Sequence, residues 1–138
     1  MGKILALDLG DQWVGTALSD ITKIIARPHH TIPHKDLMSF LKEIFKDELI
    51  ETIIIGQPIT MRGTISTQTQ KVRDEYEILR TRFPEKNWIL WDERLSSKRA
   101  QSIAPARLKE EKIKSHSRAA AFILDSYLIF LSLQKNQE

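Results

Sequence analysis

The stretch from Lys3 to Asp20, KILALDLGDQWVGTALSD, constrains the fold more than any other part of the chain. Its two short apolar runs predict the buried strands of a hairpin, joined by a polar turn. Asp8 interrupts the first run near its end. An ionised carboxylate there needs compensation, because a charge removed from water loses its solvation. Either a bound cation compensates it, or Asp8 caps the turn by accepting a hydrogen bond from the amide near Gly10.

Two glycines, Gly10 and Gly15, lie on either side of this turn. Since glycine has no side chain, a bulky anionic ligand could approach the backbone closely at both positions. We therefore take both as candidate nucleic-acid-binding residues.

The size and composition indicate a single globular domain over residues 1–138, with 41% hydrophobic and 28% charged residues. No apolar run is long enough to span a bilayer and no charged-then-apolar leader is present, so we expect a cytoplasmic protein without a membrane partner. The sequence contains no cysteine. Thiol catalysis and thiolate-held zinc are therefore excluded, and any metal must bind to oxygen or histidine.

The remainder of the chain alternates strands and helices. We predict an edge strand at 24–33, a helix at 36–49, a strand at 52–55, a polar loop at 57–66, a helix at 67–83, a strand at 88–91, a short helix from Ser96 or Ser97 to about Ile103, and a last helix at 117–133. This order predicts an α/β fold, in which a mixed five-stranded sheet has three antiparallel strands followed by parallel strands, with helices on both faces.

A second acidic group, Asp92 and Glu93, directly follows the last predicted strand. In the predicted sheet these residues lie at a strand end next to that of Asp8. Carboxylates on adjacent strands can hold one or two divalent cations, which activate water and stabilise the leaving oxygen of a phosphodiester. Because successive side chains point to opposite faces, only one of Asp92 and Glu93 can share a site with Asp8. The sequence does not decide which one.

Positive charge is concentrated between Arg94 and Arg118, where eight basic residues stand against two acidic ones, although the whole chain carries a net charge of only +3. Such a segment suits a phosphate backbone, and a solvated loop of mixed charge is the alternative. Arg62, in the predicted loop at 57–66, is a further candidate. The candidate phosphate-binding residues are then Arg62, Arg94, Lys98, Lys109, Lys112 and Lys114.

Four blocks of the sequence carry a resemblance to a known family. They are ILALDLGDQWVGTALSD, IIIGQPITMRGT, WDERLSSKRA and KSHSRAAAFILDSYL, and together they span nearly the whole chain. In this order they resemble the YqgF family, also called RuvX, of ribonuclease H-like nucleases. The resemblance implies Mg²⁺- or Mn²⁺-dependent cleavage, either in 5′-end processing of the precursor of 16S ribosomal RNA or at Holliday junctions. It also implies that Asp8 and Glu93 are the first and second acidic residues of the site.

The chain departs from the family pattern at His116, which stands where the family usually has a third acidic residue. Nine residues of helix place Asp125 on the opposite face, so Asp125 cannot replace it. We expect Asp8, Glu93 and His116 as catalytic residues, and Asp8 and Glu93 with Asp92 as metal ligands. A neutral imidazole is a poor ligand for Mg²⁺, which leaves a non-catalytic nucleic-acid-binding factor in ribosome maturation as an alternative.

The expected partner is structured RNA, with branched DNA as the alternative, and the expected state is a monomer or a weak homodimer. A sugar kinase or actin-like ATPase has a similar phosphate-binding hairpin, with an Asp and spaced glycines. That class needs two such domains closing on a nucleotide, which 138 residues cannot supply.

Overall fold

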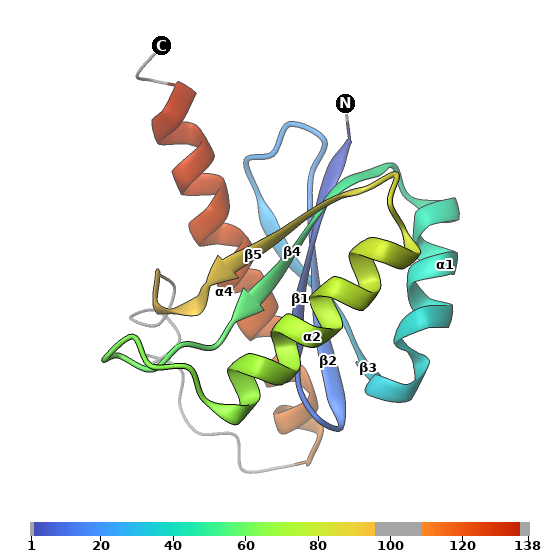
Figure 1. Cartoon of the computed structure of the whole chain (residues 1–138). Coiled ribbons are helices and arrows are strands. Elements are labelled where there is room, and N and C mark those ends of the chain that lie inside the picture. The colour runs from blue at the N-terminus through green and yellow to red at the C-terminus, as the bar shows by residue number, and fades with distance from the viewer. Residues whose placement is uncertain (1, 96–108, 136–138) are drawn as a thin grey trace.

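Five strands form one mixed sheet in the order β3-β2-β1-β4-β5 in the computed structural model, which describes residues 2–95 and 109–135, excluding the side chains of 109–114 (Figure 1). The strands are β1 (Lys3–Leu9), β2 (Trp13–Ser19), β3 (Ala26–Pro33), β4 (Ile50–Gln57) and β5 (Asn87–Asp92). The first three are antiparallel neighbours, whereas β4 pairs parallel with β1 and β5 pairs parallel with β4. The predicted α/β sheet is confirmed.

The described helices are α1 (Leu37–Asp47), α2 (Thr67–Arg82) and α4 (Lys109–Lys135), with short 3₁₀ turns η1 (His34–Asp36) and η2 (Glu93–Leu95). Figure 1 shows α1 and α2 on one face of the sheet and α4 on the other. None of the described helices is both long and apolar enough to cross a membrane.

Side-chain alternation along β1 divides the core into two layers. Leu5 and Leu7 pack in the layer under α1 and α2, whereas Ile4 and Ala6 pack in the layer under α4. Asp8 continues the second series, so its side chain belongs to the α4 face of the sheet.

The parallel register brings the carboxyl ends of β1, β4 and β5 together. Leu7 pairs with Ile55, and Gln57 pairs with Asp92. The residues that follow these pairs therefore lie at one edge of the sheet, where ligands of open α/β sheets commonly bind.

Helix α4 begins at Lys109, eight residues before the predicted start at Ser117. The segment from 109 to 114, KEEKIK, contains strong helix formers and neither glycine nor proline, so its mixed charge did not mark a loop. The predicted start of the last helix at 117 was therefore wrong, because residues 109–116 of the basic segment are helical. The short helix predicted from Ser96 or Ser97 lies outside the described residues.

Strand β3 begins at Ala26 rather than at Ile24, because the side chain of Asp20 organises the preceding turn. Asp20 Oδ1 accepts hydrogen bonds from the main-chain amides of Ile24 and Ile25, each at 2.9 Å. These bonds, with that of the Thr22 hydroxyl, hold the pKa of Asp20 well below its usual range.

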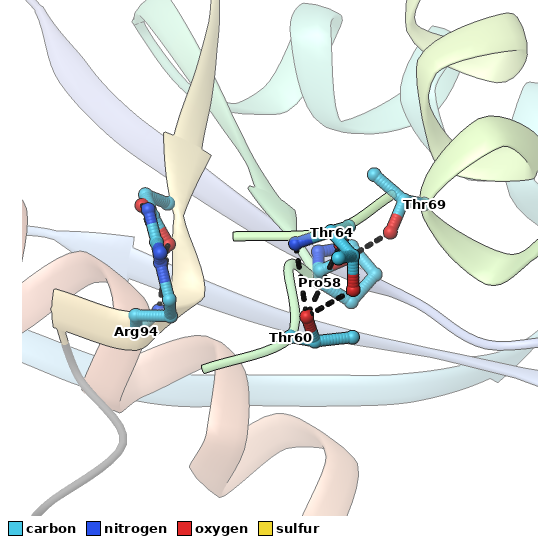
Figure 2. Close-up of polar contacts among 6 residues, drawn as sticks. Pro58, Thr60, Thr64, Thr69 and Arg94 are labelled. Atoms are coloured by element: carbon cyan, nitrogen blue, oxygen red, sulfur yellow. Dashed lines mark hydrogen bonds and ion pairs between the residues drawn. The ribbon is translucent and has the colours of Figure 1, made fainter. Parts of the chain in front are cut away.

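The loop between β4 and α2 is closed by threonine contacts (Figure 2). Thr60 Oγ1 accepts a hydrogen bond from the Thr64 amide at 3.0 Å, and the Thr69 hydroxyl donates to the Pro58 carbonyl. Ser66 then starts α2 through a capping box with Thr69. The loop is thus folded onto the start of α2.

Candidate functional site

Asp8 and Glu93 face one another at the edge of the sheet. Glu93 opens η2 directly after β5, and its carboxyl group is hydrogen bonded to that of Asp8. Burial, the negative charge of Asp8 and this hydrogen bond raise the pKa of Glu93 to about 7. Near neutral pH the pair therefore holds a proton that two separated carboxylates would have released.

Gly56 leaves the space that Glu93 occupies. A Cβ atom at this position in β4 would lie 2.7 Å from Glu93 Oε1 and 2.5 Å from Ile123 Cδ1. A side chain on Gly56 would therefore push Glu93 out of its place over the strand. We did not predict this role of Gly56. A glycine at the end of the apolar run IIIG indicates that another group approaches the strand closely, and this could have pointed to it.

Asp92 points away from the acidic pair and binds Arg94. The Arg94 amide donates to Asp92 Oδ1 at 2.9 Å, and Arg94 Nη2 donates to Oδ2 at 2.6 Å. The hydrogen bonds and charge of Arg94 lower the pKa of Asp92. Of the two candidates that the sequence left open, Glu93 is thus the one beside Asp8. Both Asp92, an expected metal ligand, and Arg94, an expected phosphate contact, are bound to each other in this structure.

His116 lies beside Asp8 on the other side of the site. Its Nδ1 is 3.8 Å from Asp8 Oδ2, and its Cε1 is 3.6 Å from where a Cβ of Gly10 would be. The N-terminal part of α4 thus places His116 next to Asp8. This is the residue that stands where the family pattern usually has a third acid. Within the part of the chain that the structure describes, no group of three His, Asp or Glu side chains is arranged to hold a metal ion.

The Gly10 amide donates to the Trp13 carbonyl at 2.9 Å. The expected alternative, in which Asp8 caps the turn through this amide, is therefore not the arrangement seen. The amide's partner is main chain, and the Asp8 carboxylate turns to Glu93 instead.

The glycine at position 15 has a different role from the expected one. A Cβ there would overlap the main-chain carbonyl of His116 and lie 2.8 Å from the Ser117 amide nitrogen. Helix α4 therefore fills the space beside Gly15, which is not open to nucleic acid. The prediction of a ligand approach at Gly15 was wrong, because the sequence did not show that α4 begins its contact with the sheet there.

The basic candidates fall in three segments of the chain, of which the structure describes two. Arg62 is exposed in the loop after β4, and its neighbour Gly63 lies against Arg94, with a Gly63 Cβ position 3.6 Å from Arg94 Nη1. Lys98 lies outside the described residues. The remaining three basic candidates belong to the first turns of α4, before His116: Lys109, Lys112 and Lys114. The structure describes the backbone of these residues but not their side chains.

A mixed five-stranded sheet with carboxyl groups at the ends of its first and last strands is the arrangement of the ribonuclease H-like class. The chain belongs to the RuvX family, because that family's model, described as Holliday junction resolvase, matches residues 2–129.

Relatives of nearly the same length support this membership. The chain is 34% identical to a protein of Rubrobacter xylanophilus, over 92% of both chains. It is 37% identical to a protein of Thermoanaerobacter pseudethanolicus, over 98% of this chain and 99% of that protein. Both relatives carry the name "Putative pre-16S rRNA nuclease". The family and these names indicate a nuclease that acts on nucleic acid.

Proposed function

We propose that this chain is a divalent-metal-dependent nuclease that acts in 5′-end processing of the precursor of 16S ribosomal RNA. The observation that carries the proposal is the contact between Asp8 and Glu93, together with the raised pKa that burial and this contact give Glu93. The names of the relatives supply the substrate. The Holliday junction is the second candidate substrate, because the matching family model is described by it.

The acidic pair fits a hard divalent cation such as Mg²⁺ or Mn²⁺. Both prefer carboxylate oxygens, and a cation would replace the proton that Asp8 and Glu93 hold together. When bound, the metal supplies an activated water and stabilises the leaving oxygen of the phosphodiester. Asp8 and Glu93 would hold it, and the cation would displace the Glu93 proton, so metal affinity should rise as the pH increases toward about 7.

His116 would act through Asp8. Its Nδ1 is placed to hold the Asp8 carboxylate in orientation at 3.8 Å, and the ring can hold or release a proton at that atom beside the reacting phosphate. Arg62 and the lysines at the start of α4 would contact phosphates on either side, because both segments flank this edge of the sheet.

The test is cleavage by the purified protein, in Mg²⁺ and in Mn²⁺, of an end-labelled 16S precursor and of a labelled four-way DNA junction. We expect metal-dependent cut products in the 5′ leader of the RNA. Cutting of the junction alone would instead favour the resolvase. Binding of either substrate without cutting in both metals would favour the non-catalytic maturation factor.

His116→Asp should raise Mg²⁺ affinity and Mg²⁺-supported cleavage, because it adds an oxygen ligand and a negative charge beside Asp8. The parent protein should prefer Mn²⁺, which accepts imidazole more readily. Calorimetric titration of both metals checks this, with His30→Asp on the exposed part of β3 as a matched control for added charge. Unchanged metal preference in His116→Asp would place residue 116 outside the metal site.

A further inference from the structure

The turn between β1 and β2 is held against α2 by side chains from one face of that helix. Gln68 Nε2 donates to the Leu9 carbonyl at 3.3 Å, and Lys71 Nζ lies 3.5 Å from Asp11 Oδ1. Glu75 Oε2 lies 2.7 Å from His34 Nε2. These three helix residues are spaced by three and four positions, which places them on one side of α2.

His34 is the centre of this contact, because both nitrogens of its ring face acceptors. Nδ1 bonds the Gly10 carbonyl and Nε2 bonds the Glu75 carboxylate. A ring that donates from both nitrogens is an imidazolium. The His34 amide also donates to the Gln12 carbonyl at 2.9 Å. His34 therefore holds the turn at two points and α2 at a third.

The charge of the ring agrees with its partners. Burial lowers the pKa of His34, but the bond to the Gly10 carbonyl and the bond and charge of Glu75 outweigh burial, so the net shift is upward. The other charged groups at this place are Asp11 on the turn and Lys71 and Asp74 on α2. Among the described side chains, Glu75 Oε1 is a buried oxygen without a hydrogen-bond partner. The ion pair with His34 is thus the main compensation of the Glu75 charge.

Apolar packing fixes the base of the turn, where Leu9 and Val72 belong to one core cluster, but the turn residues themselves are polar. A pocket of about 330 Å³ opens between the turn and α2, with His34, Gly10 and Glu75 in its wall. Where side chains leave such a space, the position of the two elements depends on the polar contacts across it.

The turn also borders the candidate active site. The Gly10 carbonyl faces His34, whereas the Cβ direction of Gly10 faces His116 Cε1 at 3.6 Å. Asp8 precedes Gly10 by two residues. A displacement of the turn would therefore move Asp8 relative to Glu93 and His116.

We propose that His34, held by Glu75, is a positioning residue that locks the β1–β2 turn against α2 and so sets Asp8 in place for catalysis. The consequence for catalysis rests on the proposed nuclease function, whereas the lock itself does not. A group whose pKa is raised in the fold stabilises it below the unfolded value, about 6.5 for histidine, and loses this effect as the pH rises through the folded pKa. The lock should therefore loosen with rising pH.

The test compares the parent with His34→Leu and Glu75→Gln, and uses Glu77→Gln as the matched control. Glu77 lies on the same helix but is exposed and bound to Arg80. In metal-free protein, ring ¹⁵N shifts give the charge and pKa of His34. Hydrogen exchange gives the protection of the Gly10 amide, which is bonded to the Trp13 carbonyl.

We expect the parent His34 to titrate above 6.5 and to titrate lower in Glu75→Gln. Gly10 protection should fall about tenfold in His34→Leu, the factor that loss of roughly one hydrogen bond gives, and should not change in Glu77→Gln. If cleavage is detected, kcat should fall in His34→Leu and in Glu75→Gln with little change in KM. Gly10 protection should fall with rising pH in the parent and in Glu77→Gln, but not in His34→Leu. A parent His34 that titrates at or below 6.5, or equal Gly10 protection in all proteins, would overturn the proposal whether or not the protein cuts RNA.

Discussion

Asp8→Asn is expected to abolish metal-dependent cleavage while the fold stays intact. Asparagine keeps the shape of the side chain but removes the ionised oxygen that the proposed metal needs. The loss should exceed about 100-fold, because even outer partners of metal ligands cost 10–100-fold in affinity or activity when they are removed. Cleavage rates in Mg²⁺ and Mn²⁺ measure it, with Asp47→Asn at the exposed end of α1 as the control.

The same substitution has a second result that does not depend on any metal. Without the Asp8 charge, the pKa of Glu93 should fall from about 7 toward its ordinary value of 4.5. The metal-free parent should lose stability as the pH rises from 4.5 through about 7, because its fold binds a proton that the unfolded chain releases. In Asp8→Asn this loss should be smaller. Unchanged cleavage together with an unchanged Glu93 titration would show that Asp8 lies outside the site.

The layers of the fold were predictable because each element carries its own pattern. The apolar run of β1 and the β-branched residues of β4 indicate buried strands, and the helical spacing of Leu41 and Ile44 indicates the buried face of α1. Element boundaries were less predictable. The start of β3 depends on hydrogen bonds that the Asp20 side chain accepts, and the start of α4 depends on helix propensity that outweighs a mixed charge pattern.

The acidic residues of the candidate site were predictable for a similar reason, since a carboxylate at the end of an apolar strand needs a partner. The choice between Asp92 and Glu93 required the structure, because the sequence does not say which face each β5 side chain takes. Ile89 and Trp91 pack in the layer under α4, and Glu93 continues this series. The contact of His34 with the β1–β2 turn and with α2 was not predicted. Its partners Gly10 and Glu75 lie 24 and 41 residues away along the chain, so no local sequence pattern indicates these contacts.

Gly15 was singled out from the sequence as a position where a side chain would be in the way, but the structure shows that α4, not a ligand, approaches it. Three consecutive alanines stand in α4, and Ala120 among them is fully buried in the layer with Ile4 and Ala6. The complementary surface on β2 is Gly15, against the His116 carbonyl. The sequence gives the small residues on both elements, but their pairing depends on where the helix crosses the sheet.

Gly15→Ala should therefore be the most destabilising single-methyl change at the site. Gly15 does not have a positive φ, so alanine would by itself reduce the entropy of the unfolded chain and stabilise the fold slightly. The added methyl group, however, would overlap main-chain atoms of His116, which cannot rotate away as a side chain can. Either β2 or the start of α4 must move, and overpacking of this kind costs about 3 kcal/mol or more when backbone is displaced.

Urea unfolding gives the free energy of Gly15→Ala, and the Trp91 signal follows α4, because Trp91 Nε1 donates to Ser126 Oγ at 2.8 Å. Gly63→Ala is the control, since Gly63 has a φ of 82° but only Arg94 Nη1 nearby, at 3.6 Å. That change should cost roughly 1–2 kcal/mol of backbone strain without moving α4. A shift of α4 in Gly15→Ala must also carry His116 away from Asp8. A variant that unfolds at the parent's midpoint with the parent's metal affinity would mean that α4 does not press on β2 at this glycine.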